Sequence, residues 1–179
     1  LSAGGNAVDA AVAGALVLAV TYPEAGNLGG GGFMLTYVDG AAQFLDYRET
    51  APAAATRDMY LDARGEVIEG LSLTGHRAVG VPGTVAGLWE AHQRYGRLPW
   101  HDVIEPAVQL AQGGFQVPPL LAERVTAEQP RFERTNFTRY FDGLRHGAWF
   151  RQPELAATLV RIRDSGPGGF YDGETADLI

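Results

Sequence analysis

The first long apolar stretch of the chain predicts a buried helix. From Ala7 to Val20 the sequence consists mostly of Ala, Val and Leu, and Asp9 is the only charged residue within it. A helix without a polar face is buried on most of its sides. Asn6, a favoured capping residue, directly precedes the run. The run is too short to span a bilayer and no basic segment precedes it, so we expect a core helix and not a secretion signal.

The pattern changes to strand character further along the chain. The segment 33–38 has the length and the β-branched and aromatic content of a strand, and Asp39-Gly40 between it and the segment 42–47 is typical of a tight hairpin turn. We expect these two strands to pair antiparallel. The second strand then ends beside the start of the first, which places Arg48 next to the glycine loop at 29–32.

Helical patterns dominate the rest of the sequence, and prolines and glycines bound them. Proline is favoured in the first turn of a helix, and glycine is favoured after the last one. One helix is expected to end before Pro130, and another is expected to stop at the run Ser165–Gly169. The expected helices cover 82–95, 101–111, 118–129, 154–164 and 174–179.

The glycine loop consists of four consecutive residues, Gly29, Gly30, Gly31 and Gly32. Because glycine loses the most backbone entropy on folding, such a run indicates that another backbone or a ligand comes very close. The loop lacks the GxGxxG spacing and opens no helix, and the chain contains no lysine, which excludes a Gly-Lys-Ser/Thr phosphate loop.

Arg48 beside this loop suggests an anion-binding site. A planar guanidinium can bind a carboxylate through two parallel hydrogen bonds, and it stays charged at any working pH. The alternative interpretation is an exposed ion pair between Arg48 and Asp46 or Glu49, with a glycine turn that serves packing only.

Several motifs occur together, in order, along nearly the whole chain. They are GGNAVDAA at 4–11, PEAGNL at 23–28, the Arg48 segment at 45–53, VPGTVAG at 81–87, YGRLPW at 95–100 and FYDG at 170–173. In this combination the chain resembles the large subunit of bacterial γ-glutamyltranspeptidases. The resemblance is weakest between 118 and 150.

The resemblance implies an α+β fold: the helix-rich, large-subunit part of the αββα sandwich of an N-terminal-nucleophile hydrolase, in which helices cover two central sheets. The predicted hairpin would belong to a central sheet. Residues 1–179 would form an incomplete segment of the large subunit without an internal domain boundary. Leu1 in place of an initiating methionine fits this expectation. By itself the segment is expected to fold poorly and to be inactive.

The resemblance also implies a reaction. In that family a precursor cuts itself into two subunits, and the new N-terminal threonine of the small subunit attacks a γ-glutamyl amide such as glutathione. Such a threonine can use its own α-amine as the general base. The acyl group then passes to water or to an amino acid or peptide acceptor. No catalytic residue is expected in this segment, and the family is usually exported to the periplasm or outside the cell.

The residue roles follow from motif position. The resemblance implies that Arg48 binds the α-carboxylate of the γ-glutamyl group. Asp46 and Glu49 flank it and are candidates to orient its side chain. Gly29, Gly30, Gly31 and Gly32 would lie near the site.

Composition and charge narrow the alternatives. The net charge is −7, so nothing favours nucleic acid or an anionic membrane as a partner. The absence of cysteine excludes a thiol nucleophile and a disulfide framework. The four histidines show no metal-ligand spacing, so neither a metal nor a cofactor is expected. The pair Asp102 and Glu105 is explained by the preference for acidic residues in the first turn of a helix.

Three other interpretations remain. A non-catalytic homologue would keep the Arg48 pocket and bind γ-glutamyl compounds without turnover. A related N-terminal-nucleophile acylase would cleave a different amide. These two cannot be separated here, because the nucleophile would lie beyond Ile179. A purely structural domain is disfavoured by the order of the motifs.

Overall fold

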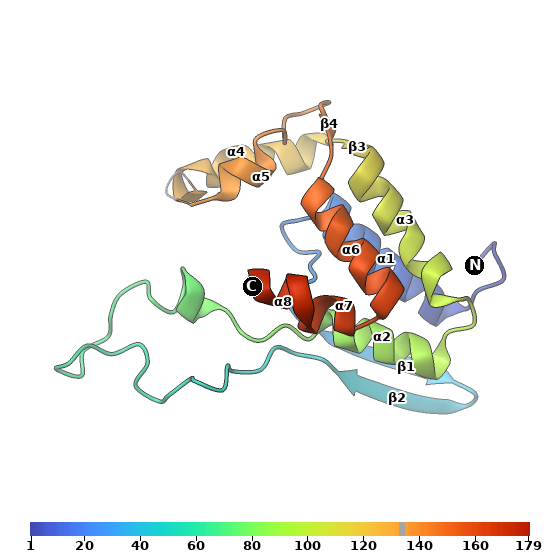
Figure 1. Cartoon of the computed structure of the whole chain (residues 1–179), viewed down its shortest axis with the longest axis horizontal. Helices are drawn as coiled ribbons and strands as arrows, with labels where there is room; N and C mark the ends of the chain where they lie inside the picture. The colour runs from blue at the N-terminus through green and yellow to red at the C-terminus, as the bar shows by residue number, and fades with distance from the viewer. Residues whose placement is uncertain (133–134) are drawn as a thin grey trace. The chain divides into compact units, whose positions relative to one another are not determined.

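A computed structural model describes residues 1–132 and 135–179 (Figure 1). Contacts between Cα atoms divide the chain into two compact units. The helical unit comprises Leu1–Asn27 together with Leu88–Ile179, and the hairpin unit comprises Leu28–Gly87. The prediction that the segment contains no domain boundary stays a prediction.

The first helix of the helical unit forms as predicted. Helix α1 covers Ala7–Thr21. Asn6 caps it, because its side-chain oxygen accepts hydrogen bonds from the backbone N–H groups of Val8 at 2.9 Å and Asp9 at 3.0 Å. The carboxylate of Asp9 accepts a return bond from the Asn6 backbone N–H at 2.8 Å, which completes a capping box.

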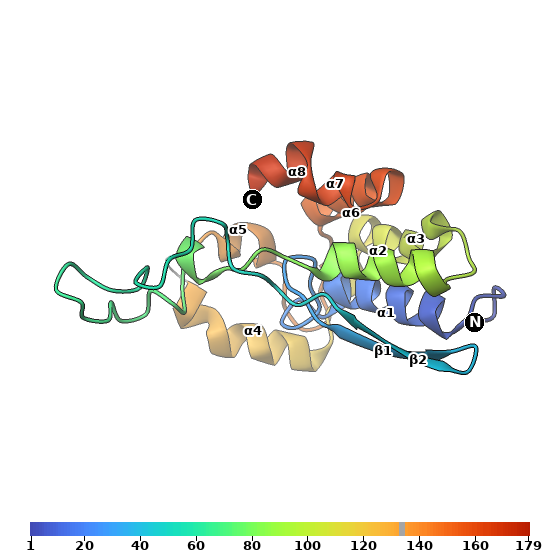
Figure 2. The ribbon, with the colours of Figure 1, turned by 90° about the horizontal axis from the view of Figure 1, so that it is seen from below.

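Three helices of this unit form a common core (Figure 2). Helix α1 packs against α3 (Trp100–Gly113), and α3 packs against α6 (Pro153–Ser165). The short helices α7 (Gly168–Tyr171) and α8 (Gly173–Leu178) follow α6. The largest fully buried side chains of the core are Leu16, Leu88, Ile104, Leu159 and Ile162. The expected helices at 101–111, 154–164 and 174–179 are therefore confirmed to within about one turn.

The region between α3 and α6 differs from the prediction. Helix α4 covers Pro119–Phe132 and runs through Pro130, where the sequence predicted its end. A proline this close to the last residue removes one N–H donor and leaves the earlier turns intact. Helix α5 covers Phe137–Phe141. The two-residue strands β3 (Phe115–Gln116) and β4 (Trp149–Phe150) pair antiparallel and were not predicted. A small second core lies here, made of Val117, Leu121, Ala122, Leu144 and Phe150.

The hairpin unit contains the predicted strand pair. Strand β1 (Phe33–Val38) and strand β2 (Ala41–Asp46) are antiparallel, with Phe33 opposite Asp46 and Val38 opposite Ala41. The turn residues Asp39 and Gly40 both have positive φ, at 52° and 79°. Positive φ at both central residues is the geometry of a type I′ turn. Strand β2 begins and ends one residue earlier than predicted.

A long segment without regular strands connects β2 to α2, interrupted by the 3₁₀ turn η1 (His76–Ala78). Helix α2 covers Thr84–Tyr95, so it begins two residues after Pro82, where the sequence predicted its start. At this start the backbone N–H groups of Gly83 and Thr84, which have no acceptor within the helix, both donate to the carbonyl oxygen of Gly30, at 2.8 and 3.0 Å.

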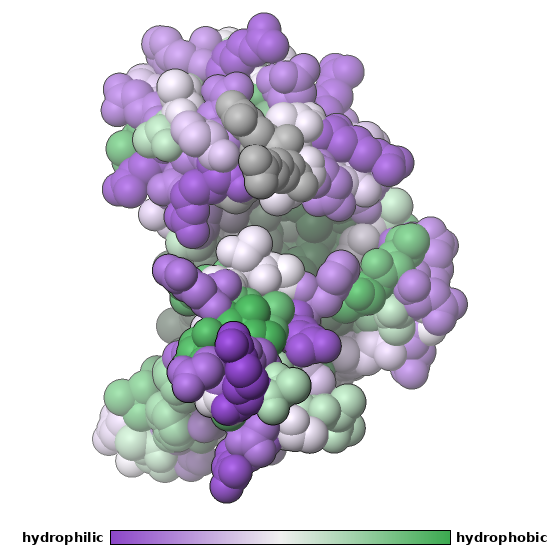
Figure 3. Space-filling view, turned by 90° about the vertical axis from the view of Figure 1, so that its left-hand side faces the viewer, coloured by the Kyte–Doolittle hydropathy of each residue, from purple (hydrophilic) through white to green (hydrophobic). Residues whose placement is uncertain are grey.

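No helix among residues 1–132 and 135–179 is long and apolar enough to cross a bilayer. Around α4 and α5, the surface visible in Figure 3 is mostly hydrophilic.

Candidate functional site

The glycine loop and the segment after β2 lie side by side, as the hairpin predicts. Gly32 and Tyr47 exchange both backbone hydrogen bonds: Tyr47 N–H donates to Gly32 at 3.0 Å, and Gly32 N–H donates to Tyr47 at 3.3 Å. This pair extends the β1–β2 ladder by one step beyond Phe33 and Asp46. The backbone of Arg48 therefore lies beside the loop, as expected from the sequence.

A third segment completes the arrangement. Thr50 and Val81 also exchange both backbone hydrogen bonds, at 3.2 and 2.8 Å. Together with the bonds from Gly83 and Thr84 to Gly30, these contacts join the loop, the Arg48 segment and the start of α2. The backbone on either side of Arg48 is therefore fixed by hydrogen bonds to two other segments.

The close backbone approach explains part of the glycine run. A Cβ atom on Gly31 would lie 2.6 Å from the carbonyl oxygen of Tyr47 and 2.7 Å from the backbone nitrogen of Glu49. A Cβ atom on Gly29 would meet nothing within 4 Å. The prediction that something passes tightly by the loop is thus correct at Gly31, where the passing chain is the Arg48 segment itself.

Arg48 carries its guanidinium at the surface. Its side chain is 67% exposed, and its Nε atom forms an ion pair of 3.1 Å with Oε2 of Glu49. The carboxylate of Asp46 accepts a hydrogen bond from the Arg48 backbone N–H at 2.9 Å. Both acidic neighbours named from the sequence therefore contact Arg48, Glu49 through the side chain and Asp46 through the backbone. The surface ion pair considered as the alternative interpretation is present with Glu49.

One oxygen of Glu49 is unusual. Its Oε2 atom is shielded from solvent and accepts no hydrogen bond from the described residues, although it lies 3.1 Å from Arg48 Nε. The short distance and the missing hydrogen bond agree if the Nε–H group of Arg48 does not point at Oε2, so that the contact is an ion pair only. Glu49 also lines a hollow of about 220 Å³ within the hairpin unit. The other lining residues include Thr50, Pro52, Tyr60, Arg77 and Gly80.

Tyr47 was not singled out for a role by the sequence, yet its side chain is half-buried. Its ring lies where side chains of Gly32 and Gly87 would otherwise be. Burial raises the pKa of its phenol above the ordinary value, so the hydroxyl stays neutral at physiological pH. No local sequence pattern reports this contact, because Tyr47 and Gly87 are forty residues apart in the chain.

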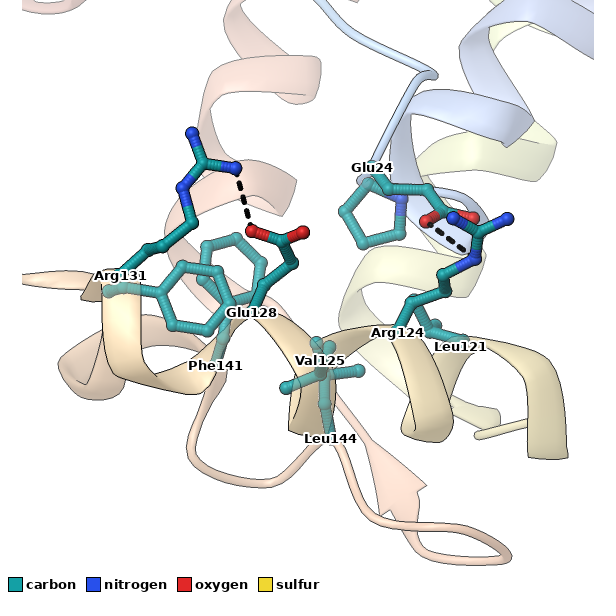
Figure 4. A pocket seen from close by; sticks show the side chains of 10 residues that line it. Glu24, Leu121, Arg124, Val125, Glu128, Arg131, Phe141 and Leu144 are labelled. Carbon is teal, nitrogen blue, oxygen red and sulfur yellow. Dashed lines mark hydrogen bonds and ion pairs between the residues drawn. The ribbon is translucent and has the colours of Figure 1, made fainter. Parts of the chain in front are cut away.

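A larger cavity of about 410 Å³ lies in the helical unit and holds none of the predicted site residues. Figure 4 shows its apolar floor, which includes Leu121, Val125 and Phe141. Two ion pairs lie at its rim, Arg124 with Glu24 at 3.9 Å and Arg131 with Glu128 at 2.7 Å.

Other titratable residues have structural explanations. His92 is buried, and its Nε2 atom lies 2.8 Å from the carbonyl oxygen of Leu98. Asp102 is exposed in the first turn of α3, and Glu105 forms an ion pair with Arg163 at 3.1 Å. In the part of the chain that the structure describes, no three His, Asp or Glu residues lie together so that they could hold a metal ion.

Comparisons with known proteins show which family the chain is similar to. The family model for gamma-glutamyltranspeptidase matches residues 1–179. The chain is 59% identical, over its whole length, to a glutathione hydrolase proenzyme from Pseudomonas aeruginosa, of which it spans 32%. The solved gamma-glutamyltranspeptidase from Pseudomonas nitroreducens, complexed with L-DON, superimposes with a TM-score of 0.94 at 60% identity. That match covers 99% of this chain and 53% of the other.

A more distant solved structure is the cephalosporin acylase from Bacillus halodurans. It matches with a TM-score of 0.81 at 29% identity, over 98% of this chain and 34% of the other. Taken together, these neighbours confirm the predicted class, an α+β chain of the N-terminal-nucleophile hydrolase type. Since the family model spans every residue, the chain belongs to the γ-glutamyltranspeptidase family. It spans about a third of the length of its curated relatives.

Proposed function

We propose that this chain is the substrate-binding part of the large subunit of an enzyme that cleaves γ-glutamyl amides, glutathione among them. The acyl group would pass through an N-terminal threonine of the small subunit to water or to an amino acid or peptide acceptor. The observation that carries the proposal is the family match over residues 1–179, with Arg48 on a backbone fixed beside the glycine loop.

Arg48 would bind the α-carboxylate of the γ-glutamyl group. A guanidinium has five N–H donors in a planar fork, and the ion pair with Glu49 engages the Nε side of that fork. A carboxylate could then be bound through the remaining donors in the two-pronged manner typical of arginine. Glu49 and Asp46 would hold the fork in place, Glu49 by charge and Asp46 through the backbone.

The small subunit from the same precursor is the expected partner, and the hairpin supports this. Antiparallel pairing places Phe33, Leu35, Tyr37 and Phe44 on one face of the β1–β2 hairpin. All four are more than half exposed. An isolated two-stranded hairpin with an uncovered apolar face is marginal in water, so another sheet of the full-length protein is expected to cover it.

The acylase alternative has a specific observation in its favour, the match to the Bacillus halodurans enzyme. Its identity is 29%, against 60% for the Pseudomonas nitroreducens enzyme, and its TM-score is also lower. We therefore place γ-glutamyl chemistry first. The non-catalytic homologue would share Arg48 and differ only in the partner sequence. Self-cleavage of the precursor and export to the periplasm or the outside of the cell belong to the same proposal.

The test is the behaviour of the full-length protein. We expect the purified precursor to separate into two chains on a denaturing gel and to release the anilide from a γ-glutamyl anilide. Adding an acceptor peptide should increase the release if transfer occurs. An uncleaved chain that binds glutamate without turnover would support the non-catalytic homologue, and cleavage of other acyl amides alone would support the acylase.

A further inference from the structure

The ring of Tyr47 occupies a slot between Gly32 and Gly87, which come from two segments of the chain, and Gly83 lies against the Tyr47 backbone. A Cβ atom on Gly32 would lie 3.0 Å from ring atom Cε2 and 3.2 Å from the hydroxyl oxygen. A Cβ atom on Gly87, in the first turn of α2, would overlap Cγ of the ring. A Cβ atom on Gly83 would overlap the carbonyl oxygen of Tyr47. A side chain at Gly83 or Gly87 would displace Tyr47, and a side chain at Gly32 would require the ring to shift by a few tenths of an ångström.

The same residue is tied down through its backbone. Tyr47 exchanges two hydrogen bonds with Gly32, and Thr50, three residues later, exchanges two with Val81. The short stretch between these two pairs contains Arg48. Its side chain is 67% exposed, whereas that of Tyr47 is half-buried. In a strand, successive side chains point to opposite faces, so a fixed ring at 47 sets the direction in which residue 48 extends.

We propose that Tyr47 is a positioning residue for Arg48. The ring lies against Gly32 and Gly87, and the carbonyl group of Tyr47 lies against Gly83. These contacts hold the backbone so that the guanidinium is presented in one orientation to a substrate carboxylate. This inference rests on the proposed role of Arg48. Preorganisation of this kind raises affinity because less conformational freedom is lost when the ligand binds.

Helix stability alone does not explain the glycine at position 87. Glycine in a helix is disfavoured relative to alanine, yet Gly87 lies within α2 against the ring. Gly14, within α1, offers a matched contrast, since a Cβ atom there would meet nothing within 4 Å. The same substitution at the two positions therefore separates displacement of the ring from the effect of helix propensity.

The experiment uses the full-length protein and measures KM and kcat for a γ-glutamyl anilide in Tyr47→Ala, Tyr47→Leu, Gly87→Ala and Gly14→Ala. We expect Tyr47→Ala and Gly87→Ala to raise KM by about fivefold or more, with kcat changed by less than about twofold. The KM of Tyr47→Leu, which fills part of the slot, should lie between those of Tyr47→Ala and the wild type. Tyr47→Phe, measured in the same way, keeps the ring and should leave KM within about twofold of the wild-type value. Gly14→Ala should leave both constants unchanged.

A double-mutant cycle distinguishes positioning from general structural damage. If Tyr47 acts through Arg48, the variant Tyr47→Ala/Arg48→Ala should be no worse than Arg48→Ala alone. Multiplicative losses in the double variant would overturn the inference, as would an unchanged KM in Tyr47→Ala or, should that variant not fold, in Tyr47→Leu. If Arg48→Ala itself leaves kcat/KM unchanged, the proposed function fails. If Arg48→Ala raises KM and the Tyr47 variants do not, only this inference fails.

Discussion

Asp9 and His92 lie together in the interior of the helical unit, with Oδ1 of Asp9 3.8 Å from Nε2 of His92 and the two side chains 2% and 7% exposed. The Asp9 carboxylate also accepts hydrogen bonds from the backbone N–H groups of Arg97, at 3.0 and 3.1 Å, and of Leu98, at 3.3 Å. One buried carboxylate thus joins the start of α1 to the turn after α2.

This carboxylate makes stability depend on pH. Burial opposes ionisation, but hydrogen bonds from the backbone N–H groups of Asn6, Arg97 and Leu98, with the nearby His92, hold the pKa of Asp9 below its ordinary value. Because the folded-state pKa is the lower one, ionised Asp9 stabilises the fold above the unfolded-state pKa of about 4. That stabilisation is lost as the pH falls through the folded-state pKa.

We therefore expect Asp9→Asn to lower the free energy of unfolding of the full-length protein by about 1–3 kcal/mol at pH 7. The amide keeps one acceptor oxygen but places an NH2 donor where the second carboxylate oxygen accepts from backbone N–H groups. The deficit relative to the wild type should shrink when the pH is lowered below about 4. Denaturant unfolding of the wild type and of Asp9→Asn, at pH 7 and at acidic pH, measures the deficit and its change with pH. Equal unfolding midpoints of the two proteins at pH 7 would contradict the stabilising role of Asp9.

The glycine loop gives a second prediction, in which Gly31 is replaced and Gly29 of the same run serves as the control. Gly31→Ala places a methyl group 2.6 Å from the carbonyl oxygen of Tyr47, so the two segments must separate. Overpacking of this kind costs about 1–3 kcal/mol. Gly29→Ala meets nothing within 4 Å and should be tolerated. Thermal unfolding of both variants tests this prediction. Similar unfolding midpoints of Gly31→Ala and Gly29→Ala would refute the close approach at Gly31.

A third prediction concerns the acidic neighbours of Arg48. Glu49→Gln removes the charge of the 3.1 Å ion pair and keeps the size of the side chain. Since an ion pair with a well-exposed arginine contributes at most about 1 kcal/mol, KM for a γ-glutamyl donor should rise by up to about fivefold. Asp46→Asn keeps an oxygen acceptor for the Arg48 backbone N–H and should have a smaller effect. An unchanged KM in the double variant would argue against an orienting role.

Local signals were sufficient to predict much of the fold. Asn6 before an apolar run predicted the start of α1, and Asp39-Gly40 predicted the antiparallel hairpin, with the second strand one residue later than observed. Antiparallel geometry then predicted that the backbone before Arg48 returns to the glycine loop. Each of these inferences needs only residues that are close in sequence, or the fixed geometry of one hairpin.

The features that were missed depend on contacts between distant residues. The hydrogen bonds that join the start of α2 to the glycine loop end on Gly30, more than fifty residues earlier in the chain. Strands β3 and β4 have two residues each, too few for a periodic pattern. The enclosure of Tyr47 by Gly87 joins two segments whose proximity no local pattern reports.

Binding of the donor α-carboxylate by Arg48 is tested by kcat/KM of the full-length Arg48→Ala variant. Two substrates are compared, a γ-glutamyl anilide and the matching anilide without the α-carboxylate. With the first, we expect a loss of about 2–5 kcal/mol, or roughly thirty-fold to a few thousand-fold. Arg48→Lys should recover little, since an ammonium cannot reproduce the two-pronged contact. With the second substrate, wild type and variant should be alike. Near-normal kcat/KM of Arg48→Ala on the γ-glutamyl anilide would contradict the account.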